Sequence, residues 1–183
     1  LNLDLSAPDW RLLWPQLIVF VLAVVLVFAD AFIPKHRSFQ ILTGISLVGY
    51  LLAIGVLFLQ HDRIGSTFQG SFRADGLTVF LSLIILIAAV FSILVSANYI
   101  KDYGDRVPIG EYYILIAFSV LGALVVSSAG DLITIFVGLE LSALATYVLT
   151  GFTKRNAQSV EGALKYFLLG IFASAILLYG MSW

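Results

Sequence analysis

The segment Asp131–Thr150 reads DLITIFVGLELSALATYVLT, and it decides the fold class of the chain. It is apolar along its length and long enough to cross a membrane as an α-helix, which takes about 20 residues. Its internal charge, Glu140, lies about 13 Å of helix rise from the start, near the middle of a hydrocarbon layer about 30 Å thick. Ionisable groups at such depth are costly unless they face protein or water. Glu140 is therefore predicted to be an intramembrane acid that moves protons or ions.

The next apolar segment carries a base. Val160–Gly180 reads VEGALKYFLLGIFASAILLYG, with Lys165 in its second turn and Glu161 one turn earlier on the same helical face. We expect this helix to run antiparallel to the preceding one, so that Glu140 and Lys165 lie on neighbouring helices with an axial offset of about 7 Å. A water or a third ionisable group is expected to bridge them. Asp131 is predicted to cap the N-terminus of the first segment and to complement its dipole.

Structural interpretations of the same residues remain open at this point. Lys165 can extend to the membrane interface and pair with Glu161. Glu140 can be a neutral carboxyl whose hydrogen bonds hold helices together. Small residues are interpreted as packing surface rather than as ligands: Gly138, Ser142, Ala143, Ala145, Gly162, Gly170, Ala173 and Ser174.

Composition places the whole chain in a membrane. Of 183 residues 61% are hydrophobic and 11% are charged, the mean hydropathy is +1.04, and a soluble domain is about 25% charged. The net charge of −1 offers nothing for nucleic acid to bind, and the absence of cysteine with two histidines argues against iron–sulfur, c-type haem and thiolate zinc sites. There is no glycine-rich phosphate loop. We therefore expect no cofactor, metal or redox centre in this chain.

The predicted fold is all-α, a polytopic membrane protein with six transmembrane helices in one domain over residues 1–183. A short external hairpin is expected around Thr67–Arg73, where polar and aromatic residues alternate about a glycine. Asp30 is interpreted as an end-of-helix partner for the basic turn Lys35–Arg37. The helices are expected at about residues 12–32, 41–59, 77–97, 112–128, 131–150 and 160–180.

The basic residues give an orientation. The turns after the first, third and fifth spans hold Lys35, Arg37, Lys101, Arg106, Lys154 and Arg155, whereas the other side holds Arg11, Arg63 and Arg73. Basic residues concentrate on the cytoplasmic side of membrane proteins. The N-terminus is therefore predicted to lie outside.

Several motifs resemble one known family. The run Gly130–Leu141, followed by Tyr147, Lys154-Arg155, Ala163–Phe167 and Ala173–Ala175, is similar to subunit N of proton-pumping NADH:quinone oxidoreductase, respiratory complex I. The pattern Phe68-x-Gly70-x-Phe72-x-x-Asp75 resembles the external hairpin of the same subunit.

The resemblance implies a function. Glu140 matches the family's fifth-helix glutamate and Lys165 its sixth-helix lysine, which implies that both are proton-channel residues. The chain would be the N-terminal part of an antiporter-like fold of about fourteen helices arranged as inverted repeats. It would couple quinone reduction to proton pumping in a hetero-oligomer of membrane subunits in the bacterial plasma membrane. NADH, FMN, iron–sulfur clusters and quinone would bind to partner subunits.

Two related functions remain as alternatives. One is a subunit of a multisubunit cation/proton antiporter, which has no redox partner. The other is a subunit of a ferredoxin- or plastoquinone-type complex. The identity of the partner subunits would distinguish them.

Overall fold

Six long helices make up most of the part of the chain that the structure describes, and each is long and apolar enough to cross a membrane. The computed structural model describes residues 8–33, 35–60, 64–103 and 109–183. The helices are α1 (Trp14–Phe32), α2 (Lys35–Leu59), α3 (Gly76–Tyr103), α4 (Ile109–Ser127), α5 (Leu132–Thr150) and α6 (Ala157–Met181). The predicted all-α, six-span membrane fold is confirmed.

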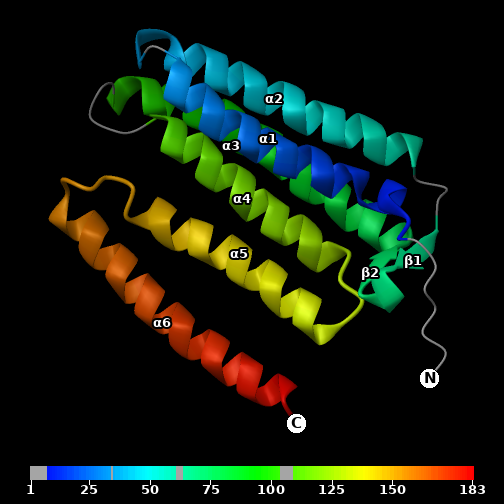
Figure 1. Cartoon of the computed structure of the whole chain (residues 1–183). Coiled ribbons are helices and arrows are strands. Elements are labelled where there is room, and N and C mark those ends of the chain that lie inside the picture. The colour runs from blue at the N-terminus through cyan, green and yellow to red at the C-terminus, as the bar shows by residue number, and fades with distance from the viewer. Residues whose placement is uncertain (1–7, 34, 61–63, 104–108) are drawn as a thin grey trace.

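Helices α1–α4 form a packed body, and α5 and α6 form a pair beside it. Helix α4 packs against α1, α2 and α3, α5 packs against α4, and α6 lies at the outer edge against α5 (Figure 1). Consecutive helices run in opposite directions, so the molecule has two ends. We call them the hairpin end, where α1, α3 and α5 begin, and the loop end, where α2, α4 and α6 begin.

The core lies inside the α1–α4 body. Its fully buried side chains come from all four helices and include Leu26, Tyr50, Leu86, Tyr113 and Leu124. The Tyr113 hydroxyl lies 2.6 Å from the hydroxyl of Thr43, so α4 and α2 share a hydrogen bond within this core. Because lipid tails are as apolar as leucine, close packing and such hydrogen bonds, rather than removal of apolar surface from water, hold this body together.

Some helices are longer than the sequence predicted. Helix α2 begins at Lys35 and α3 continues to Tyr103. Basic residues that were predicted to lie in the connecting turns, such as Lys35 and Lys101, therefore belong to the first or last turn of a helix. Hydropathy detects the part of a helix inside the hydrocarbon layer and misses charged turns that extend beyond it. The predicted contact of Asp30 with the basic turn falls on side chains outside the described residues. The Asp30 carboxylate lies against α4, where a Cβ on Gly110 would be 1.9 Å from it.

The predicted hairpin is present, and it is docked onto the α4–α5 turn. Strands β1 (Gly65–Thr67) and β2 (Phe72–Ala74) pair antiparallel, with Gly65 opposite Ala74. The Arg73 N–H donates to the Ser128 carbonyl at 2.8 Å, and the Gly130 N–H donates to the Ser71 carbonyl at 2.8 Å. A side chain at position 130 would meet a backbone carbonyl oxygen at 1.8 Å, so this close approach requires glycine.

Candidate functional site at the α5–α6 interface

Glu140 is the ninth of the 19 residues of α5, which puts it about 12 Å from the start of the helix and near mid-membrane. Its side chain is half-buried between α5 and α6. The Ser174 hydroxyl on α6 donates a hydrogen bond to Glu140 Oε1. The structure thus gives this intramembrane carboxyl a polar partner on the neighbouring helix.

Small residues of α6 allow the two helices to approach. The Tyr147 hydroxyl lies so close to Gly170 that a Cβ there would be 1.9 Å away, and the Tyr147 ring makes an edge contact with the ring of Tyr166 at a centroid distance of 4.8 Å. About one helical turn further toward the loop end, a Cβ on Gly151 would lie 2.8 Å from the Cβ of Ala163. Tyr147 and Glu140 are seven residues apart and share a helical face. The α5 face toward α6 therefore carries both.

The opposite face of α5 packs on α4 through glycine. A Cβ on Gly122 of α4 would lie 2.5 Å from the backbone nitrogen of Ser142 and 2.6 Å from the carbonyl oxygen of Gly138. The hydroxyls of Ser119 and Ser142 are 3.2 Å apart beside this crossing. The backbone contact fixes α5 rigidly to the body, so the helix carrying Glu140 has a defined position.

Lys165 is not brought to Glu140. Its Nζ lies 2.5 Å from Glu161 Oε1, and the two side chains are 70% and 63% exposed. Lys165 is five residues from Gly170, or about 140° around the helix from the face that contacts α5. Along the axis of α6, Lys165 is nine residues from Ser174, the residue that contacts Glu140. Lys165 therefore lies about 13 Å along the helix axis from the level of Glu140. The predicted offset of about 7 Å was wrong because α6 extends past the end of α5, with Ala163 opposite Gly151.

Asp131 caps α5 as predicted. Its Oδ1 accepts a hydrogen bond from the Thr134 N–H at 2.6 Å. The hydrogen bond from the Ser71 hydroxyl, followed by the one from the Thr134 N–H, lowers the pKa of Asp131 below its usual value. A carboxylate at this place complements the helix dipole. The β1–β2 hairpin and the start of α5 therefore share a charge-assisted contact.

Ser174 is a site residue that sequence reasoning interpreted as packing surface. A serine among alanines and glycines is a common helix-packing residue, and nothing local marks it as a partner of Glu140. The missing information was the register of α5 against α6, which depends on how far α6 extends beyond the α5–α6 turn. A small polar residue on the α6 face opposite an intramembrane acid was the available signal.

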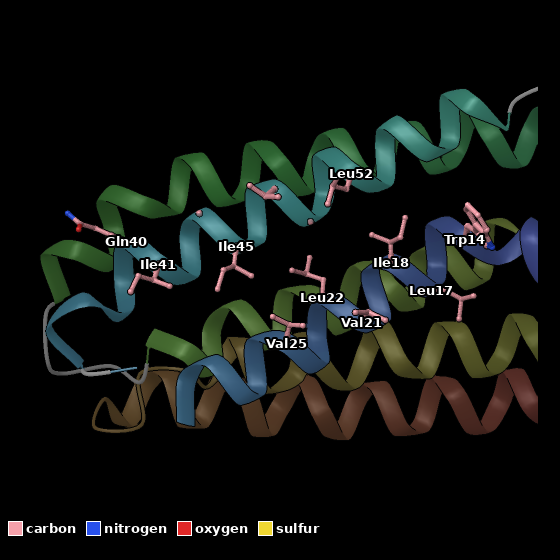
Figure 2. Close-up of a pocket in the computed structure, with 13 residues that line it drawn as sticks. Trp14, Leu17, Ile18, Val21, Leu22, Val25, Gln40, Ile41, Ile45 and Leu52 are labelled. Carbon is pink, nitrogen blue, oxygen red and sulfur yellow. The ribbon is translucent and has the colours of Figure 1, made fainter. Parts of the chain in front are cut away.

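An apolar groove of about 810 Å³ lies away from this site, between α1 and α2 (Figure 2). Trp14 and Gln40 lie toward its two ends, and aliphatic residues such as Ile18, Val25 and Leu52 line its walls between them. Because its lining carries no ionisable group, this groove offers no step to a proton or cation. Among the described residues no group of three His, Cys, Asp or Glu side chains is arranged to hold a metal ion.

Comparison with known proteins agrees with this architecture. Residues 129–183 match the family described as NADH:quinone oxidoreductase/Mrp antiporter, TM. The structure resembles a chain of respiratory complex I from Thermus thermophilus with bound aureothin, with a TM-score of 0.74 and 30% sequence identity over 91% of this chain and 35% of that one.

Curated relatives are similar along nearly the whole chain. NADH-quinone oxidoreductase subunit N of Desulfovibrio desulfuricans is 41% identical over 95% of this chain and 34% of its own length. Subunit N 2 of Koribacter versatilis is 36% identical over 99% of this chain and 38% of its own length. NAD(P)H-quinone oxidoreductase subunit 2 of Trichodesmium erythraeum is 38% identical over 94% of this chain and 32% of its own length. The chain is thus a homologue of subunit N of NADH-quinone oxidoreductase, and it spans a little over a third of the length of such relatives.

Proposed function

We propose that this chain is part of a proton-translocating, antiporter-like membrane subunit of an NADH:quinone oxidoreductase, in which Glu140 takes up and releases the proton. The observation that carries this proposal is a single carboxyl half-buried at mid-membrane with a hydroxyl donor on the adjacent helix. Such a group is costly in lipid, and relay of charge is a common reason for keeping one there.

We assign Lys165 as a second relay residue, with Glu161 as its ion-pair partner and Asp131 as a supporting cap. In support, Lys165 and Glu161 lie on an apolar helix that has no buried residue in this chain. Charges on a lipid-facing helix surface are unfavourable, so further protein is expected to cover them. The relatives are nearly three times as long as this chain, which leaves additional helices for that role.

The proposed setting is a hetero-oligomer in the bacterial plasma membrane with the N-terminus outside. The electron-transfer groups, namely NADH, FMN, iron–sulfur clusters and quinone, would bind to other subunits. Reporter fusions to the full-length protein test the orientation. A reporter after Arg155 is expected to be cytoplasmic and one after Arg73 external; the opposite pattern would contradict the proposed orientation.

The decisive substitution is Glu140→Gln in the full-length protein within the intact complex. Glutamine keeps the shape and accepts the same hydrogen bond but cannot change charge. We expect normal assembly and a severe loss of protons moved per electron. Glu111→Gln is the matched control, because Glu111 pairs with Lys154 at the loop end. Normal pumping by an assembled Glu140→Gln complex would refute the relay role.

Lys165→Arg separates a relay from an interfacial ion pair. Arginine keeps the charge and can pair with Glu161, but it does not release its proton in proteins. We expect quinone reduction at a lower rate and a measurable loss of protons moved per electron. An Arg variant with the wild-type ratio would assign Lys165 to the interface and leave Glu140 as the relay.

A cation/proton antiporter is the competing function, since the matching family includes both classes. Purification of the full-length protein from its native membrane distinguishes them. Flavin and iron–sulfur subunits are expected to co-purify with it; membrane subunits alone would favour the antiporter.

A further inference from the structure

Ser174 has a distinctive place on α6. The described α6 residues that are partly buried form a narrow strip of mostly small side chains. They are Ser159, Gly162, Ala163, Gly170, Ser174 and Met181. Ser159 donates to the Thr150 carbonyl at the loop end. Ser174 is the polar member of this strip that lies deep in the membrane, and its hydroxyl reaches Glu140.

The hydroxyl suits a partner that changes charge. An ionised carboxylate accepts hydrogen bonds only, whereas a protonated carboxyl also donates one. A serine hydroxyl donates and accepts, so Ser174 can stay hydrogen-bonded to Glu140 in both states. An alanine at this position would offer neither interaction.

The helix contact beside Ser174 holds it in place. Gly170, one turn from Ser174 on the same face, receives the Tyr147 hydroxyl in close contact. On the side of α5 that faces α4, the polar groups near this level are the uncharged hydroxyls of Ser142 on α5 and Ser119 on α4, which contact each other. Ser174 is therefore held within reach of Glu140 by packing that does not involve the carboxyl.

We propose that Ser174 is the positioning residue of Glu140: its hydroxyl holds the carboxyl against α6 in both of its charge states. This inference rests on the proposed relay role of Glu140. Ser174 itself passes no proton to the solvent and forms no covalent bond. Its effect is on the orientation of Glu140.

The test uses the full-length protein in the intact complex, with Ser174→Ala and Ser174→Thr. Ser142→Ala is the matched control, because it removes a hydroxyl two residues from Glu140 on the face that meets α4. Two quantities are measured on assembled complexes. The first is the rate at which a hydrophobic carbodiimide, which reacts with protonated carboxyls in the membrane, labels Glu140, quantified by mass spectrometry at one pH. The second is the number of protons moved per electron.

We expect Ser174→Ala to raise the labelling rate by on the order of tenfold, in keeping with the loss of the hydrogen bond that holds the carboxyl against α6, and to lower the proton-to-electron ratio. Ser174→Thr keeps the hydroxyl, so its labelling rate and its proton-to-electron ratio should stay close to the wild-type values. Ser142→Ala should leave both unchanged. If Ser174→Ala does not assemble, Ser174→Cys, a weaker donor of similar size, should give an intermediate increase in labelling.

Three results would overturn the proposal: wild-type labelling in Ser174→Ala or, in its place, Ser174→Cys; a Thr variant as impaired as the Ala variant; or equal effects of Ser142→Ala and Ser174→Ala. The failure of the relay role is distinguishable from these. It would show as normal pumping by Glu140→Gln, whereas the labelling rate of Glu140 reports the Ser174 hydrogen bond whether or not the carboxyl carries pumped protons.

Discussion

The α1–α4 body and the α5–α6 pair are both apolar, yet they are built for different tasks. In α1–α4 the charged residues of the sequence are confined to the first or last few positions of each helix, and the interior is filled by buried side chains such as Leu26 and Leu124. In α5 and α6 charge lies inside the apolar stretch, at Glu140 and Lys165, and α6 has no buried residue. Apolar length thus identifies a membrane span, whereas the depth of its charges indicates whether the span carries function.

The largest expected difference in unfolding free energy is between alanine substitutions at two leucines. Leu26 is 0% exposed in the body and Leu169 is 70% exposed on α6. Leu26→Ala should leave a cavity and cost about 2 kcal/mol of unfolding free energy, the low end of the usual range because lipid supplies little hydrophobic driving force. Leu169→Ala should cost little in this chain. The measurement is a denaturant titration in detergent micelles, and equal losses for the two variants would remove the distinction between body and pair.

Repeating the Leu169→Ala measurement in the complete complex sharpens the same comparison. If further helices cover the outer face of α6, this substitution should destabilise the complex more than it destabilises the isolated chain. An equal effect in both would mean that the face stays in contact with lipid.

A second contrast concerns the joint between the two regions. At Gly122 an added Cβ meets backbone atoms of α5 at 2.5 and 2.6 Å, while at Gly44 on α2 nothing lies within 4 Å. Backbone atoms cannot move aside as a flexible side chain can, so Gly122→Ala should cost about 1–3 kcal/mol as overpacking. Gly44→Ala, on the open groove of Figure 2, should be nearly neutral. A neutral Gly122→Ala in the same titration would show that α5 is loosely attached.

The smallest expected effect is a dependence of folding stability on acidic pH, caused by Asp131 at the start of α5. Because the folded-state pKa of Asp131 is lowered, its carboxylate contributes stability above the unfolded pKa, and this contribution is lost as the pH falls through the folded pKa. The loss therefore lies below 3.8, the usual pKa of an aspartate carboxyl. Asp131→Asn keeps a capping side chain without the charge.

Between about pH 4 and pH 2, the thermal midpoint should therefore fall less in Asp131→Asn than in wild type. Asp75, whose pKa is lowered chiefly by the hydrogen bond from the Thr78 N–H, is present in both proteins and contributes equally. Parallel pH curves for the two proteins would assign the acid sensitivity to other groups.

The sequence predicted the spans, the hairpin and the cap of α5, because each depends on local chemistry. Apolar length marks a membrane helix, and an aspartate before an apolar run marks an N-cap. It also predicted Glu140 at mid-membrane, since depth within a span is a matter of counting residues. What it did not predict was the register of α6 against α5, because that depends on contacts such as Tyr147 with Gly170. The partner of Glu140 and the pairing of Lys165 away from it both follow from that register.

The docked hairpin has a consequence for biogenesis. Its strand β2 lies between the second and third spans, yet it is completed by backbone hydrogen bonds to Ser128 and Gly130, which lie between the fourth and fifth. During synthesis those partners are translated after α3 and α4. The hydrogen bond between Arg73 and Ser128 therefore forms only when α4 has crossed the membrane, so its formation depends on correct insertion of the first four spans.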